Sequence, residues 1–281
     1  MSVRKNRGDS KGFWIAILVV VVIVQALLLF KPELKKLPAI KKPAKPVVVK
    51  PKIEKKVEKP IAGRIAIVID DWGYNSSHCD LLAEIKSPVS VAILPNLPHS
   101  ADVARCAHAQ GKEVMLHLPL EPHKILETYP RDYLIMTTMS KDKIERILEK
   151  HLASVPYAEG VNNHTGSAAT EDRRLMSIIF NKLKEKNLFF LDSLVTSQSI
   201  CRRLAKEASL PFAERDIFLD NENTRTAIEE QFALLAEEAQ TKGYATAIGH
   251  DRPLSLRIIK EQTQKLQQEG FKFISAGDLA K

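Results

Sequence analysis

Residues 65–71 read Ile-Ala-Ile-Val-Ile-Asp-Asp. A run of five apolar residues closed by charged ones is typical of a short strand buried in a parallel sheet. The two carboxylates that follow need partners, because a charge taken out of water must be paired, hydrogen-bonded or bound to a metal. This stretch therefore predicts a buried strand with a polar site at its carboxyl end.

The same pattern recurs toward the C-terminus, where short apolar runs alternate with longer amphipathic segments. The apolar runs predict strands at residues 65–69, 89–94, 114–118, 160–163, 188–191, 212–213, 245–248 and 272–274. The amphipathic segments predict helices near residues 77–85, 101–109, 141–154, 172–186, 199–208, 226–242 and 255–268. This alternation predicts parallel strands covered by helices. Seven or eight units favour a (β/α) barrel, and an open doubly wound sheet would give the same pattern.

The N-terminal residues predict a membrane anchor. Residues 12–30 are nineteen residues with one polar interruption, Gln25. As a helix they would be about 28 Å long, which matches the hydrocarbon core of a bilayer and exceeds the apolar region of a signal peptide. We therefore expect one uncleaved transmembrane helix. The basic flank, residues 1–11, keeps the N-terminus cytoplasmic, which predicts a single-pass protein of a bacterial inner membrane with a periplasmic main domain.

Residues 31–61 are predicted to form an extended linker. Residues 31–60 hold eleven lysines, three glutamates and six prolines without hydrophobic periodicity, so they cannot build a core. The chain has a net charge of +8, and because the flank contributes +3 and the linker +8, residues 61–281 carry −3. The basic character belongs to the tail, so a nucleic-acid partner is not expected.

Polar side chains follow several of the predicted strands, at the end where parallel α/β folds place their sites. They are Asp70, Asp71, His117, Asn162, Asn163, His164, Asp192 and His250. Two histidines and a carboxylate are a common ligand set for a catalytic Zn²⁺. Asp70 and Asp71 would point to opposite sides of a continuing strand, but a turn at the strand end can bring both to one site. The plainer alternative is that each strand-end aspartate only caps the next helix.

The remaining histidines and the cysteines give weaker signals. Five histidines fall in predicted helices or loops and are expected to be surface groups or caps: His78, His99, His108, His123 and His151. None of the three cysteines shows a metal-ligand spacing. Cys79 and Cys106 fall on consecutive predicted helices and could pair in an oxidising compartment, but three ordinary thiols are the preferred expectation.

Several of these segments together resemble the divergent polysaccharide deacetylase family over residues 62–281. They are Ile67-Val-Ile-Asp-Asp71 with Trp72-Gly-Tyr-Asn75, Leu116-His-Leu-Pro-Leu-Glu-Pro122, Gly160-Val-Asn-Asn-His-Thr-Gly-Ser167, Phe190-Leu-Asp-Ser193, Arg215-Asp-Ile-Phe-Leu-Asp-Asn221 and Ile248-Gly-His250. The resemblance implies a distorted (β/α) barrel of seven or eight units, related to metal-dependent carbohydrate esterases that remove N-acetyl groups from chitin-like or peptidoglycan sugars.

The resemblance also implies roles for individual residues. In the wider group a pair of aspartates supplies a base and a metal ligand, which carries over to Asp70 and Asp71 respectively. Ordinary members read His-Thr/Ser-x-x-His with both histidines on the metal, whereas this chain reads His164-Thr-Gly-Ser-Ala168. His117 is the nearest substitute for the missing ligand, and His250 takes the place of the general acid. Supporting roles fall to Asn163, Asp192 and Asp216, and the expected metal is Zn²⁺.

The function implied is metal-assisted hydrolysis of an N-acetylated cell-wall glycan or a similar polysaccharide. Asp70 would accept a proton from water and His250 would give one to the departing amine. The alternative is a catalytically weak or inactive module that binds glycan or a partner protein in cell-envelope maintenance. The altered second motif favours this alternative. The arginine-proline motif of ordinary members is also absent, so their way of orienting the substrate does not carry over to this chain. A serine hydrolase is not supported, because no G-x-S-x-G elbow occurs.

Overall fold

The computed structural model describes Gln25, residues 61–124 and residues 133–280. The predicted transmembrane helix, residues 12–30, lies outside the described residues except for Gln25. The basic flank and, apart from Ile61, the linker also lie outside them. Within the described ranges, no helix is both long enough and apolar enough to cross a bilayer.

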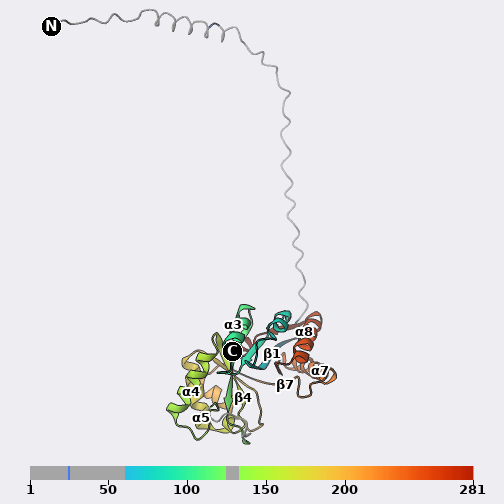
Figure 1. Cartoon of the computed structure of the whole chain (residues 1–281). Coiled ribbons are helices and arrows are strands. Elements are labelled where there is room, and N and C mark those ends of the chain that lie inside the picture. Colours follow the sequence, from blue (N-terminus) through green and yellow to red (C-terminus); the bar gives the residue numbers. More distant parts are fainter. Residues whose placement is uncertain (1–24, 26–60, 125–132, 281) are drawn as a thin grey trace, which may run out of the picture. The chain divides into compact units, whose positions relative to one another are not determined.

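The described residues contain one parallel sheet surrounded by helices (Figure 1). Its strands are β1 (Gly63–Trp72), β2 (Ser90–Ile93), β3 (Glu113–Leu120), β4 (Ala158–Thr165), β5 (Phe189–Asp192), β6 (Phe212–Glu214), β7 (Ile217–Phe218), β8 (Tyr244–His250) and β9 (Phe271–Ile274). The strand order is β6-β5-β4-β3-β2-β1-β8-β7. The long strand β1 pairs with β8 along most of its length, with β9 along its first half and with β2 along its second half.

Helices connect most successive strands, as the alternation predicted. The helices are α2 (Cys79–Glu84), α3 (Ser100–Ala109), α4 (Lys141–Ser154), α5 (Arg173–Glu185), α6 (Cys201–Ala208), α7 (Arg225–Lys242), α8 (Pro253–Gln268) and α9 (Ala276–Leu279), with the 3-10 helix η1 (Ala169–Glu171) before α5. The exceptions are that β6 runs directly into β7 and that α9 follows the last strand. Side-chain caps fix the start of three long helices, because Ser140, Asp172 and Thr224 each accept a backbone N–H bond from the first turn of α4, α5 and α7.

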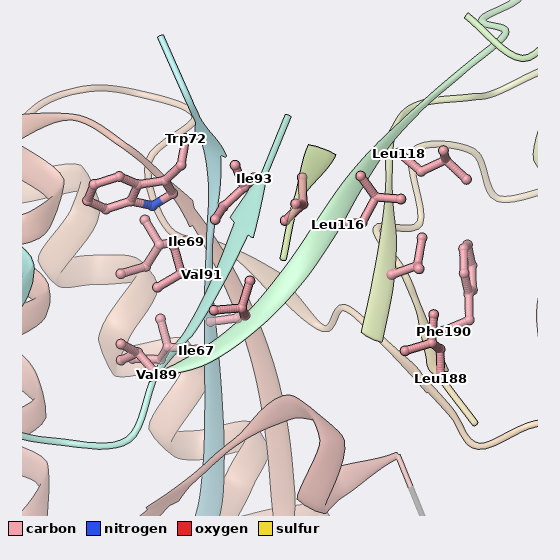
Figure 2. Packing of buried hydrophobic residues seen from close by; sticks show 14 of the residues in the cluster. Ile67, Ile69, Trp72, Val89, Val91, Ile93, Leu116, Leu118, Leu188 and Phe190 are labelled. Atoms are coloured by element: carbon pink, nitrogen blue, oxygen red, sulfur yellow. The ribbon is translucent and has the colours of Figure 1, made fainter. Parts of the chain in front are cut away.

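Alternate residues of the strands face two separate apolar layers. Side chains such as Ile67, Val91 and Leu116 lie on one face of neighbouring strands and pack with the helices (Figure 2). The residues between them form a smaller layer on the other face that includes Val68 and Met115, and α9 is the one described helix that contributes to it. The sheet is therefore a curled half-barrel with helices outside the curl, and not a doubly wound sheet, which has helices on both faces.

The two edges of the curl are joined by one bent segment, residues 212–218. Its first part is β6, which pairs with β5, and its second part is β7, which pairs with β8. At the bend the Arg215 amide donates to the Asp192 carbonyl (3.0 Å) and the Asp216 amide donates to the Thr246 carbonyl (2.9 Å). In the part of the chain that the structure describes, β6 and β7 do not pair with each other, so the ladder stays open here.

A disulfide links the first two helices. Cys79 at the start of α2 and Cys106 in α3 are bonded, with Cα atoms 6.5 Å apart. The expectation of three free thiols is therefore wrong; the two cysteines meet because α2 and α3 pack against each other. Cys201 is free and buried.

Candidate functional site

The inner face of the curl is apolar at one end of the strands and polar at the other. Val68, Met115 and Ile248 belong to the inner apolar layer. Residues two positions apart on a strand share a face. The next inward-facing side chains on these three strands are therefore Asp70, His117 and His250. These three residues were predicted to follow the strands, but they lie within β1, β3 and β8. The strands extend through them because the open end of the curl accommodates polar side chains.

Asp71 reaches the same site through an irregularity in β1. By strict alternation its side chain would face outward, but the pairing of β1 with β2 shifts register between Ile69 and Trp72. Asp71 itself has φ of 67°, a left-handed conformation that costs a non-glycine residue about 1–2 kcal/mol. His117 Nε2 consequently lies 3.6 Å from Asp70 Oδ2 and 3.3 Å from Asp71 Oδ1. The expectation that both aspartates can face one site is confirmed.

Three side chains from three strands form a compact donor triad, which we define as Asp71, His117 and His164. His164 Nδ1 lies 3.0 Å from His117 Nε2 and 3.2 Å from Asp71 Oδ1, and His117 Nε2 completes the triangle at 3.3 Å from Asp71 Oδ1. The structure therefore brings together the three residues that the resemblance assigned to the metal.

The donor triad fits a small divalent cation. Zinc bonds of about 2.0–2.1 Å in tetrahedral geometry separate neighbouring ligand atoms by about 3.3 Å, and the three separations here are 3.0, 3.2 and 3.3 Å. Asp71 Oδ1 is buried with no aligned hydrogen-bond donor, although two imidazole nitrogens are close to it. A cation between the three atoms would neutralise this buried carboxylate oxygen.

Electrostatics separates the two neighbouring carboxylates. Burial raises the pKa of Asp70, and the nearby His117 opposes this only in part. Burial also acts to raise the pKa of Asp71, but His117 and His164 beside it hold the pKa well below its usual range. Asp71 is therefore the carboxylate that stays ionised, as a ligand must, while Asp70 is the more basic of the two.

His250 lies beside this cluster and has its own carboxylate partner. The pairing of β1 with β8 sets His250 opposite Asp70. Its Nδ1 lies 2.6 Å from Oδ1 of the fully buried Asp220, which also accepts bonds from the His250 amide (3.0 Å) and the Ser255 hydroxyl (2.5 Å). Burial lowers the pKa of His250, but the bond to Asp220 and its charge outweigh this, so the pKa is raised.

Sequence reasoning missed Asp220, and it named Asn162 among the polar residues after the strands without giving it a role. Asp220 stands in the same motif, residues 215–221, as Asp216. Of these two aspartates, Asp220 is the one that contacts His250. Asn162, which is fully buried, lies between Asp70 and His117: its Nδ2 donates to Asp70 Oδ1 (2.8 Å) and its Oδ1 lies 2.9 Å from His117 Nδ1. An inward-facing amide two positions before His164 on the same strand was the available signal.

The three residues predicted to support the site lie farther from it. Asn163 accepts a bond from the Ser193 amide (2.8 Å) and so joins the end of β4 to the end of β5. Asp192 accepts bonds from the Leu194 amide and the Ser199 hydroxyl in the loop before α6. Asp216 accepts bonds from the Thr246 amide and Lys242 at the opposite end of the strands.

The amino ends of the strands carry a separate hollow of about 680 Å³, which Asp216, Arg64 and Lys242 help to line. None of the donor triad residues lines it. It lies at the wrong end of a parallel sheet for a conventional active site, so its size does not argue against the smaller, better-organised cluster at the carboxyl ends.

Comparison with known proteins gives relatives over most of the described domain. An uncharacterised protein of Escherichia coli K12, YibQ, is 36% identical over 207 residues, which are 73% of this chain and 64% of that protein. An uncharacterised protein of Haemophilus influenzae Rd is 32% identical over 216 residues, which are 77% of this chain and 76% of that protein. The crystal structure of an uncharacterised protein from Agrobacterium tumefaciens C58 has the same fold, with a TM-score of 0.73 at 22% identity over 77% of this chain and 89% of that one.

The fold and the site define an α/β half-barrel with an Asp-His-His donor cluster at the carboxyl ends of its strands. Residues 67–280 match the divergent polysaccharide deacetylase family. The chain belongs to this family, which confirms the resemblance drawn from its motifs.

Proposed function

We propose that this protein is a metal-dependent deacetylase that hydrolyses the N-acetyl amides of cell-wall glycan, held by an N-terminal membrane helix on the periplasmic side of the inner membrane. The donor triad carries the proposal, because three ligand-type atoms from three strands lie 3.0–3.3 Å apart. The only carboxylate oxygen among them is buried without an aligned donor. Family membership supports the class of substrate.

Asp71, His117 and His164 would hold the cation, and a set of two imidazoles and one carboxylate favours Zn²⁺. Such a cation supplies Lewis-acid polarisation of the amide carbonyl and lowers the pKa of bound water. Asp70, beside the triad and with a raised pKa, accepts the proton of the attacking water. His250, kept protonated by Asp220, gives a proton to the amine as the C–N bond breaks.

Two features support the proposed location. Residues 12–30 have the length and composition of a transmembrane helix, preceded by a basic flank. The Cys79–Cys106 disulfide suits an oxidising compartment such as the periplasm, since cytosolic thiols are kept reduced. The linker between them has the composition of an extended spacer.

The test uses the purified full-length protein. We expect about one zinc per chain by elemental analysis and acetate release from N-acetylated chito-oligosaccharides or peptidoglycan fragments. Asp71→Asn should lose both, while His250→Ala should keep the metal and lose hydrolysis by about 10²–10⁴-fold. His108→Ala is the matched control, because His108 is an exposed histidine of α3 that stacks on Tyr157. A wild type without bound divalent metal would refute the proposal.

The alternative function is a glycan- or partner-binding module with little or no hydrolysis. It is favoured by the altered second motif, in which Ala168 occupies the position of the second histidine of ordinary deacetylases. This function predicts metal binding and retention on N-acetylated glycan without release of acetate, and equal glycan affinity for the wild type and His250→Ala.

A further inference from the structure

We propose that Asn162 is the positioning residue that holds the imidazole of His117 in the tautomer required for metal binding. Asn162 is no ligand itself, and it lies on β4 with no exposed surface. The inference rests on the proposed metal site. It is argued from which atoms donate and which accept in the hydrogen bonds of the Asn162 side-chain amide.

The amide of Asn162 has one orientation that satisfies its neighbours. Its Nδ2 is 2.8 Å from Asp70 Oδ1, a carboxylate oxygen that accepts, and 3.4 Å from Ser193 Oγ. The Ser193 hydroxyl uses its own proton on the Asn163 carbonyl (2.9 Å), so toward Asn162 it can only accept. Both neighbours of Nδ2 are therefore acceptors, and the amide nitrogen, which has two protons, is the correct group to face them.

This orientation decides which nitrogen of His117 carries the proton. Asn162 Oδ1 faces His117 Nδ1 at 2.9 Å, and because an amide oxygen only accepts, Nδ1 must be the donor. A neutral imidazole with a proton on Nδ1 has an unprotonated Nε2. That nitrogen is the one directed at the other two triad atoms, 3.0 Å from His164 Nδ1 and 3.3 Å from Asp71 Oδ1.

Burial makes the arrangement effective. Asn162 and His117 are 0% and 3% exposed, so water offers no substitute acceptor for Nδ1–H. Without Asn162, the proton of a neutral His117 would move to Nε2, where the Asp71 carboxylate accepts it, and the lone pair would turn away from the metal. Loss of the acceptor behind a ligating histidine typically weakens metal binding about 10- to 100-fold.

The experiment compares two substitutions in the full-length protein. Asn162→Ala removes the acceptor for Nδ1–H, and Asn162→Leu removes it while filling the space, so that no water can take the place of the amide oxygen. We expect the Zn²⁺ dissociation constant, measured by competition with a chelating dye, to rise about 10- to 100-fold in both variants. Thr246→Val, which changes a buried polar residue of β8 remote from the triad, is the control and should leave Zn²⁺ affinity unchanged.

A second readout does not depend on metal. In the metal-free protein, at a pH where the imidazole is neutral, ¹⁵N shifts of the His117 ring should report a proton on Nδ1 in the wild type and on Nε2 in Asn162→Ala. A wild type protonated on Nε2 would overturn the proposal, and so would unchanged Zn²⁺ affinity in both Asn162→Ala and Asn162→Leu. Absence of Zn²⁺ binding by the wild type would refute the proposed function instead, while the ring shifts would still decide the role of Asn162.

Discussion

Removal of the Cys79–Cys106 disulfide should cost the domain a large share of its stability. The bond joins cysteines 27 positions apart. In the chain-entropy model, a closed loop of this length stabilises the folded state by about 3.5 kcal/mol at 25 °C. Folded domains are stable by only about 5–15 kcal/mol, so the effect is easily measured. With a urea m value of about 2–3 kcal/mol/M, the unfolding midpoint should fall by about 1–2 M.

The assay is urea unfolding followed by circular dichroism, with and without dithiothreitol. The reductant should lower the unfolding free energy of the wild type by about 3.5 kcal/mol. It should not affect the double variant Cys79→Ala/Cys106→Ala, whose stability should equal that of the reduced wild type. Cys201→Ala, which removes the buried free thiol, should keep the full response to reductant. A wild type whose unfolding free energy changes by less than about 1 kcal/mol on complete reduction would refute the reasoning.

Three further predictions concern protonation, metal and packing. Burial lowers the pKa of His151 to about 4 in the folded chain, whereas a histidine in the unfolded chain has a pKa of about 6.5. As the pH falls, the unfolded chain therefore takes up this proton before the folded chain does. Stability is thus lost between pH 6.5 and 4, and from pH 7 to 5 the wild type should lose about 2 kcal/mol more than His151→Gln in urea unfolding; equal losses would contradict this. Zn²⁺ at 100 times its dissociation constant should stabilise the wild type by about 2.7 kcal/mol, reversibly with EDTA, and leave Asp71→Asn unaffected in thermal unfolding. Gly63→Ala should cost about 1–3 kcal/mol in the same assay, because its Cβ would lie 2.6 Å from the Ala239 carbonyl oxygen; an unchanged melting temperature would show that α7 can shift.

The strands and helices were predictable where the apolar pattern was regular. Helix α4 begins and ends at the predicted residues, and the other long helices differ by one or two residues at their ends. Three elements, β7, η1 and α9, were not predicted, because a strand of two residues and helices of three and four residues are too short for a period to show. Helix α9 fills the inner apolar layer, a role that depends on the curl of the whole sheet.

The chemistry of the site was easier to predict than its geometry. Residue type and position predicted a metal-type site at the carboxyl ends of the parallel strands, and the family resemblance assigned Asp71, His117 and His164 to the metal. The left-handed backbone of Asp71 was not predictable, because an aspartate does not require that conformation. His151 was expected at the surface but is buried, since its ring bonds to Asn96 and the Tyr133 carbonyl.

The bent segment of residues 212–218 also governs how the domain can open. The Arg215 amide bonds to one edge of the curl and the Asp216 amide to the other, so neither edge can leave without disturbing two adjacent residues. In hydrogen-exchange terms, amides on two strands that are distant in the sheet order belong to one opening unit. We therefore expect the amides of Arg215 and Asp216 to exchange at similar rates if the curl widens as one unit.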